Sequence, residues 1–245
     1  MNKVEISGGD LRPGFLEGLA EMPALEHLVI WGGAVRNADL EPLSRLTGLR
    51  HLCLGEMPID DGVLLYLRNM RALDTLILPY TGIRGDFSPL EGLPLRDIRL
   101  EGSRFVGDAC AATLARFPTL RKVEIHMTGL TDAGVKLLAG LPLETLWLGP
   151  RITDEGMTAM AGIPTLRHID ICAHMVTDEG VAAIVGLRNL EVVWLSRCSV
   201  TDASIPVLSG MTGLKELNVN YTGVTPEGMA KLRAALPSTR FVEAD

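Results

Sequence analysis

Apolar residues recur along this chain in one repeated arrangement, apolar-x-x-apolar-x-apolar. The arrangement occurs ten times at a spacing of 22 to 25 residues, and a fragment of an eleventh copy starts near Thr239. Alternating apolar positions predict a short strand with one face turned to a core, and the long connection between successive strands requires them to lie parallel. A period in the twenties is typical of a solenoid. The copies begin at Met1, Leu25, Leu49, Leu73, Leu95, Leu120, Leu143, Leu166, Leu190 and Leu214.

The second part of each unit carries the signals of a short helix. Residues 153–156 read TDEG, and residues 177–180 repeat the same four letters. A threonine before two acids is a typical helix start, and a glycine often stands where we expect the helix to end. Between strand and helix, position nine of the unit often holds a small hydroxyl or thiol, which we expect to turn inward and bond the loop backbone. These residues are Thr81, Ser103, Thr128, Cys198 and Thr222.

The phrase LxxLxLxx(T/C), followed by TDxG, resembles that of leucine-rich repeat proteins. It is most similar to the cysteine-containing subtype and to related bacterial cytosolic repeats, and the resemblance covers essentially the whole chain. It implies an α/β fold, a single right-handed solenoid domain over residues 1–245. About ten units would form a curved parallel sheet on the concave face and short helices on the convex face. The unit from Leu73 is short and leaves little room for a regular helix, and the unit from Leu25 offers Asn37 or Asp39 as a cap but no TDxG, so we expect short or irregular convex elements there. The family implies binding, and only rarely catalysis.

Strand alternation predicts which side chains leave the core. Positions three, five and seven of each unit should project from the concave sheet. All three tryptophans of the chain, Trp31, Trp147 and Trp194, fall at these positions, as do four of its five histidines. Packing of the scaffold does not require this, whereas tryptophan is enriched at binding hot spots. The concave face is therefore predicted to bind a partner.

One cluster on this face stands out. Trp147, Asp170 and Trp194 occupy position five in three consecutive units. Since parallel strands lie about 4.8 Å apart, the two indoles are expected roughly 9–10 Å apart, with the carboxylate between them. Such a slot suits a guanidinium, which can pair with the acid and stack on an indole. The predicted protein-binding residues are Trp31, His126, Trp147, His168, Asp170, Trp194, Asn218, Asn220 and Tyr221.

Charge and cysteine usage narrow the choice of partner and location. The net charge is −7 and the sequence pI is about 5.3, which argues against tracking of nucleic-acid phosphates and against adsorption to an anionic membrane. The four cysteines lie in separate units rather than in paired clusters, which is typical of a reducing compartment. The first ten residues show no apolar signal core. These observations predict a cytoplasmic protein with a basic or arginine-bearing protein partner, and they leave its oligomeric state open.

Catalysis and metal binding are weaker interpretations. The run His168-x-Asp170-x-Cys172-x-His174 contains metal-binding residue types, but alternate residues of a strand stand about 6.5–7 Å apart, which is far for one zinc ion. Cys172 with His126 or His168 could form a nucleophile and base, although an open sheet offers no evident oxyanion hole. No nucleotide-binding glycine motif is present. We therefore expect no catalytic residue, no metal and no cofactor.

The leading hypothesis is a protein–protein interaction module that binds a partner on its concave face. By analogy of fold, it could neutralise or sense a cognate protein, as an immunity protein does. Two alternatives stay open. One is a thiol-dependent hydrolase acting through Cys172. The other is a substrate receptor or scaffold within a larger assembly.

Overall fold

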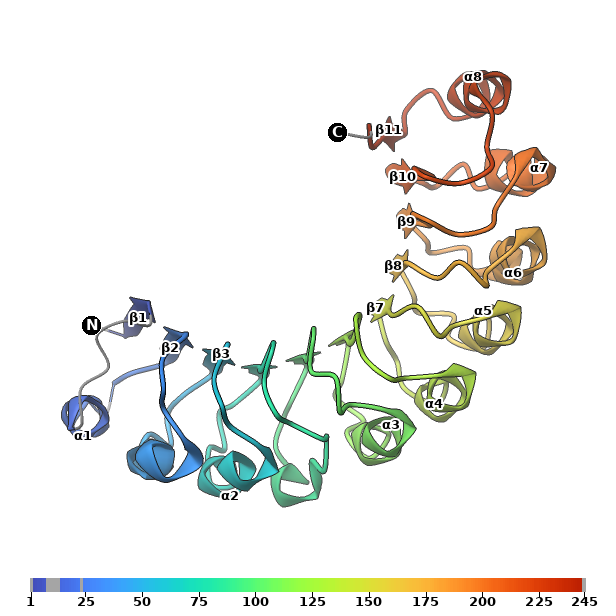
Figure 1. Cartoon of the computed structure of the whole chain (residues 1–245). Helices are drawn as coiled ribbons and strands as arrows, with labels where there is room; N and C mark the ends of the chain where they lie inside the picture. Colours follow the sequence, from blue (N-terminus) through green and yellow to red (C-terminus); the bar gives the residue numbers. More distant parts are fainter. Residues whose placement is uncertain (1, 8–13, 23, 244–245) are drawn as a thin grey trace.

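The computed structural model describes residues 2–7, 14–22 and 24–243. Its strands form one parallel sheet in which each strand pairs with the next along the chain, and the sheet lines the inside of an arc (Figure 1). This is the solenoid that the periodicity predicted, with about ten units and a parallel sheet on its concave face. The expected start of the first unit, Met1, lies outside the described residues. The strands are β1 (Lys3–Ser7), β2 (His27–Trp31), β3 (His51–Gly55), β4 (Thr75–Ile77), β5 (Asp97–Arg99), β6 (Lys122–Glu124), β7 (Thr145–Leu148), β8 (His168–Ile171), β9 (Val192–Trp194), β10 (Glu216–Asn218) and β11 (Arg240–Phe241).

Short helices cover the outside of the arc (Figure 1). In the units from Leu25 and Leu73 the convex element is 3-10 helix, which confirms the expected irregularity. The α-helices are α1 (Phe15–Ala20), α2 (Leu64–Leu67), α3 (Asp108–Leu114), α4 (Asp132–Leu138), α5 (Asp154–Met160), α6 (Asp178–Ala183), α7 (Ile205–Ser209) and α8 (Pro226–Ala235). The 3-10 helices are η1 (Asn37–Arg45), η2 (Asp61–Val63), η3 (Ser88–Leu90), η4 (Ile184–Gly186) and η5 (Asp202–Ser204). No helix of the described chain is both long enough and apolar enough to cross a bilayer.

The repeated apolar positions build one continuous core between sheet and helices. In the unit from Leu166, for example, Leu166, Ile169 and Ile171 are fully buried. The inward turn at position nine is also as expected, because the Thr128 hydroxyl donates to the carbonyl of Ile125 at 2.6 Å. The same kind of bond, from Thr81 to Leu78 O, measures 3.0 Å. In these units the hydroxyl therefore satisfies a backbone carbonyl at the end of the strand, inside the protein.

Each TDxG segment also ties its unit to the one before it. Thr153 caps α5 by accepting the N–H of Glu155, as the sequence predicted. In addition, Asp132 of the preceding unit accepts the Thr153 backbone N–H at 2.9 Å and its hydroxyl at 2.7 Å. The same two bonds join four further pairs, Asp108 with Thr131, Asp154 with Thr177, Asp178 with Thr201 and Asp202 with Thr225. This Asp–Thr ladder, not predicted from the sequence, runs along the second half of the solenoid.

The glycine of TDxG leaves space for that ladder. A Cβ built at Gly156 would overlap Asp132 Oδ1, and one at Gly180 would overlap Asp154 Oδ1. In the unit that has serine at this place, the Ser204 hydroxyl instead donates to Asp178. The TDxG motif therefore leaves room for the aspartate carboxylate of the preceding unit, in addition to starting a helix.

We predict that Gly156→Ala lowers the free energy of unfolding by roughly 1–3 kcal/mol, because a methyl group forced into a packed site costs about this much. Gly140→Ala is the matched control. Its Cβ would meet no atom within 4 Å, so its effect should stay within about 0.5 kcal/mol or be stabilising. Chemical denaturation of both variants provides the measurement. Equal stability of the two would contradict the role assigned to Gly156.

Candidate protein-binding surface on the concave face

The pairing register aligns the concave columns as the alternation predicted. Trp147 on β7 pairs with Asp170 on β8, which pairs with Trp194 on β9. The two tryptophans are half-buried, and Trp31 on β2 is 38% exposed. All three indoles therefore lie outside the hydrophobic core. The prediction of which strand side chains face away from the core is therefore correct.

The two indoles of the central cluster stack on each other. Their ring centroids are 6.2 Å apart with an interplanar angle of 23°, so the expected slot of 9–10 Å is wrong. The strand spacing sets where the Cβ atoms of Trp147 and Trp194 lie, but both side chains are long enough to lean together across β8. The Trp194 indole is held there by a hydrogen bond from its Nε1 to Glu216 Oε1 of 2.7 Å. A flat group cannot insert between rings at this separation.

Asp170, on the strand between the two tryptophans, is the unusual charge of this cluster. No described residue donates a hydrogen bond to its carboxylate or forms an ion pair with it. Burial raises its pKa to about 6, and the nearby Glu124 acts in the same direction, while His126 acts against it. A carboxylate that is partly desolvated without a donor is costly when ionised. Asp170 is therefore a site where a donor from outside the chain would be stabilising.

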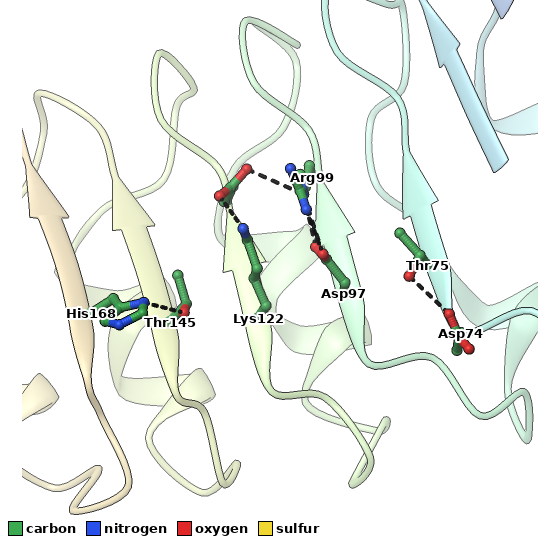
Figure 2. A network of polar contacts seen from close by, with 8 residues as sticks. Asp74, Thr75, Asp97, Arg99, Lys122, Thr145 and His168 are labelled. Atoms are coloured by element: carbon green, nitrogen blue, oxygen red, sulfur yellow. Dashed lines mark hydrogen bonds and ion pairs between the residues drawn. The ribbon is translucent and has the colours of Figure 1, made fainter. Parts of the chain in front are cut away.

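The charges on the strands before this cluster are paired among themselves (Figure 2). Arg99 donates three hydrogen bonds to Asp97, at 3.0, 3.3 and 2.7 Å, and lies 3.4 Å from Glu124 Oε2. Lys122 Nζ lies 2.7 Å from Glu124 Oε1 and 5.3 Å from the ring centre of Trp147. This network leaves Asp170 outside its pairs.

The predicted histidines lie beside the cluster. The ring of His126 is 5.8 Å from that of Trp147, and its Nε2 lies 2.9 Å from Glu101 Oε1. The same Glu101 oxygen accepts the hydroxyl of Tyr80 at 2.8 Å. His168, next to Asp170 on β8, has its Nδ1 3.5 Å from the Thr145 hydroxyl (Figure 2). Tyr80 was missed from the sequence because it stands at position eight, one residue beyond the columns expected to face the partner.

The three C-terminal residues of the predicted surface differ in exposure. Asn218 is buried, and its side-chain oxygen accepts the backbone N–H of Asn220 at 3.0 Å, so it braces the end of β10. Asn220 is half-buried. Tyr221 is 64% exposed, and its ring lies 5.4 Å from the guanidinium of Arg197. Arg197 is a second position-eight residue that the sequence analysis did not select.

Trp31 belongs to a separate patch. It lies over Gly55, where an added Cβ would be 2.6 Å from the indole. The rings of His27 and His51 are 5.7 Å apart on the same part of the sheet. Five strand spacings separate β2 from β7, about 24 Å along the sheet. The structure therefore does not bring Trp31 together with Trp147.

The thiol of Cys172 is exposed, but its surroundings do not activate it. Partial desolvation by the atoms packed around it, and then Asp170, raise the pKa of this thiol, and Arg197 acts against the shift. A catalytic thiol requires a lowered pKa or an adjacent base, and no described histidine forms a hydrogen bond with Cys172. Within the described part of the chain, no three His, Cys, Asp or Glu residues gather as a metal site would require.

Comparison with known proteins agrees with the fold. A sequence profile described as a leucine-rich repeat matches residues 211–232. The chain is similar to two solved internalins of Listeria monocytogenes. It shares 17% identity with InlF (TM-score 0.52, covering 100% of this chain and 87% of that one) and 20% with internalin C2 (TM-score 0.56, covering 78% and 84%). A plant peptide hormone receptor, RGFR1 in complex with RGF2, shares 14% identity (TM-score 0.53) over all of this chain and 43% of the receptor chain. No curated protein matches.

The fold is that of a leucine-rich repeat solenoid, and residues 211–232 match the repeat itself. The place of this chain in the cysteine-containing subtype, or among bacterial cytosolic repeats, stays a prediction.

Asp170→Asn is predicted to raise the free energy of unfolding at pH 7 by roughly 1–3 kcal/mol, since each unit of pKa shift corresponds to about 1.36 kcal/mol. The pKa of Asp170 is raised from 3.8 to about 6, so the folded protein favours the protonated acid. The protonated Asp170 carboxyl makes its full contribution to stability below about pH 4, and this contribution is lost as the pH rises through about 6. Denaturant titrations between pH 4 and 7 measure this, and the variant should lose that part of the pH dependence.

The control for this experiment is Asp97→Asn. Arg99 already pairs with the Asp97 carboxylate, so removing its charge should not raise stability. If Asp170→Asn were no more stable than the wild type at pH 7, the claim that a desolvated Asp170 carboxylate destabilises the fold would be refuted.

Proposed function

We propose that this protein binds a partner protein on its concave face, and that the indole pair with Asp170 is the anchor. The observation that carries the proposal is the Asp170 carboxylate, which is partly buried beside two tryptophans and has no donor from the described chain. Scaffold packing gains nothing from such a group, because it destabilises the fold when ionised. A partner that supplies a donor would remove this penalty on binding.

The partner is expected to present an arginine or another basic group. A guanidinium can form two charge-assisted hydrogen bonds with a carboxylate and can also stack against the outer face of an indole. Lys122 already adopts a cation–π position over Trp147. Since the indoles stack on each other, the guanidinium would lie along β8 at Asp170, against an outer indole face rather than between the two rings. His126 and His168 would then border the bound group.

The remaining predicted residues form an outer contact. Trp31 would touch the partner at a separate point on the same face, while Asn220 and Tyr221 extend the anchor toward β11. The net charge of −7 would speed association with a basic protein and would make the rate sensitive to salt. RGFR1, which has the same fold, was solved in complex with RGF2, and that complex supports a recognition role by analogy.

We further propose that the biological role is neutralising or sensing a cognate protein in the cytoplasm. A substrate receptor or scaffold would use the same concave face and differs only in what the partner does next. The hydrolase alternative requires an activated Cys172, and the raised pKa of that thiol argues against it.

Trp194→Ala and Trp147→Ala are each expected to weaken partner binding by about 2 kcal/mol or more, the loss typical of a hot-spot aromatic residue. The partner would first be isolated from the native source as the protein retained by the wild type and not by the empty resin. Its affinity for each variant would then be measured by calorimetry.

Leu137→Ala is the matched control. Leu137 is an exposed apolar residue on α4, on the convex side, and its loss should leave affinity unchanged. The anchor would be rejected by equal affinity of the wild type and both folded tryptophan variants.

A further inference from the structure

The amino end of the solenoid leaves part of its core uncovered by the described chain. Val4 and Ile6 of β1 pack against the core but are only half-buried. Their neighbours on β2, Leu28 and Ile30, are fully buried. Phe15 of α1, at the same end of the arc (Figure 1), is 38% exposed. These apolar side chains form a partly exposed surface around the first strand.

The carboxyl end, in contrast, is closed by its own residues. Phe241 of β11 is buried. The guanidinium of Arg233, on α8, lies 4.9 Å from the centre of the Phe241 ring and 2.7 Å from Glu243. The last apolar residue is therefore covered by a paired charge, and the amino end exposes more apolar surface than the carboxyl end.

The outer edge of β1 also carries free backbone groups. Within residues 2–7, 14–22 and 24–243, β1 pairs only with β2. The Asn2 carbonyl accepts the N–H of His27, so Asn2 and every second residue after it face β2. Lys3 and Glu5 therefore direct their backbone N–H and C=O groups outward. An edge of this kind can pair with another strand.

The side-chain charges of β1 are complementary to a second copy of the same strand. Lys3 and Glu5 are exposed, and Lys3 Nζ lies 2.8 Å from Glu5 Oε1. When two copies pair antiparallel about a two-fold axis at Val4, Lys3 of each copy stands opposite Glu5 of the other. Opposite charges directly across an antiparallel pair stabilise it. A two-fold axis at Glu5 would instead bring the two Glu5 side chains together, which is unfavourable.

The same charges disfavour head-to-tail stacking of copies. The column of paired residues that begins with Lys3 and His27 ends with Glu216 and Arg240. A copy added beyond β11 in this register would place its Lys3 beside Arg240, and like charges across a pair are destabilising. A closed two-fold contact at β1 is therefore favoured over an open chain of copies.

We propose that two copies of this chain associate through the outer edges of β1, antiparallel and with the two-fold axis at Val4. Lys3 of each copy exchanges backbone hydrogen bonds with Glu5 of the other, and the half-buried side chains of Val4 and Ile6 are covered. The two sheets then continue into each other and bring two concave faces into one assembly. This inference goes beyond the proposed function and does not depend on the anchor at Asp170.

Sedimentation equilibrium over a concentration series tests the association. The wild type is expected to reach twice the chain mass of 26.4 kDa, and to dissociate on dilution by mass action. Glu5→Lys should weaken the association at least about tenfold, because like charges then face each other twice in the dimer. Lys3→Glu should weaken it similarly. A chain with both changes restores opposite charges across the pair and should associate as the wild type does.

Glu144→Lys is the matched control. It makes the same change of charge at an exposed acid in the middle of the solenoid, and it should leave the association unchanged. Thermal unfolding of each variant checks that it folds. A wild type that stays monomeric throughout, as it would if residues 8–13 covered the edge, overturns the proposal. So does a double variant that fails to associate, or a wild type that grows beyond the dimer as the concentration rises.

Cysteine pairing tests the register of the two strands. Lys3→Cys and Glu5→Cys chains, each with Cys172→Ser to remove the exposed thiol, would be mixed and oxidised in air. Opposite residues of a hydrogen-bonded pair lie about 5.5 Å apart between Cα atoms, which a disulfide can bridge. The expected product is the mixed disulfide of the two chains. A disulfide formed mainly between two Glu5→Cys chains would contradict the axis at Val4.

Discussion

The alignment of each unit with the next is the constraint on which this structure depends. Backbone pairing along the sheet supplies it on the concave side, and the Asp–Thr ladder supplies it on the other side of the loop. Asp154, for example, accepts both the N–H and the hydroxyl of Thr177 in the following unit. A strand that slipped by one residue would turn its apolar side chains outward, and its unit would lose both bonds of the ladder. Two independent sets of hydrogen bonds thus keep the concave columns in phase.

The same alignment puts Asp170 where its ionised form is unfavourable. The alignment places its carboxylate between two tryptophans in one column, and the indoles then stack on each other and partly desolvate the acid. The neighbouring network of Arg99, Lys122 and Glu124 does not extend to it. Sites where a protein tolerates such a group are frequently functional. A rigid scaffold can hold a carboxylate whose ionised form is unfavourable. A partner with a positive charge then binds more tightly, because pairing removes that penalty.

Much of the fold could be predicted from the sequence, because a repeat multiplies weak signals. The phase of Leu166, Ile169 and Ile171 predicted which face is buried, and that phase put Trp147 and Trp194 outside the core. The side-chain detail could not be predicted in this way. Strand spacing sets the separation of Cβ atoms, but the lean of two indoles depends on rotamers and on partners such as Glu216, which lie in other units.

Two further features also escaped the sequence. The contact of Asp132 with Thr153 joins residues 21 apart, and its only local trace is the glycine of TDxG. The left-handed turns at Tyr80 and Arg197 are not marked by glycine or asparagine, so the usual signal for this conformation is missing.

The account is tested most directly by the ionisation of Asp170 itself. The chemical shift of its side-chain carboxyl carbon, followed by NMR through a pH titration, reports the protonation of this one group. The account predicts a midpoint near the pKa of about 6. A midpoint near 4, the ordinary value for a solvated aspartate, would contradict a desolvated carboxylate beside the indole pair.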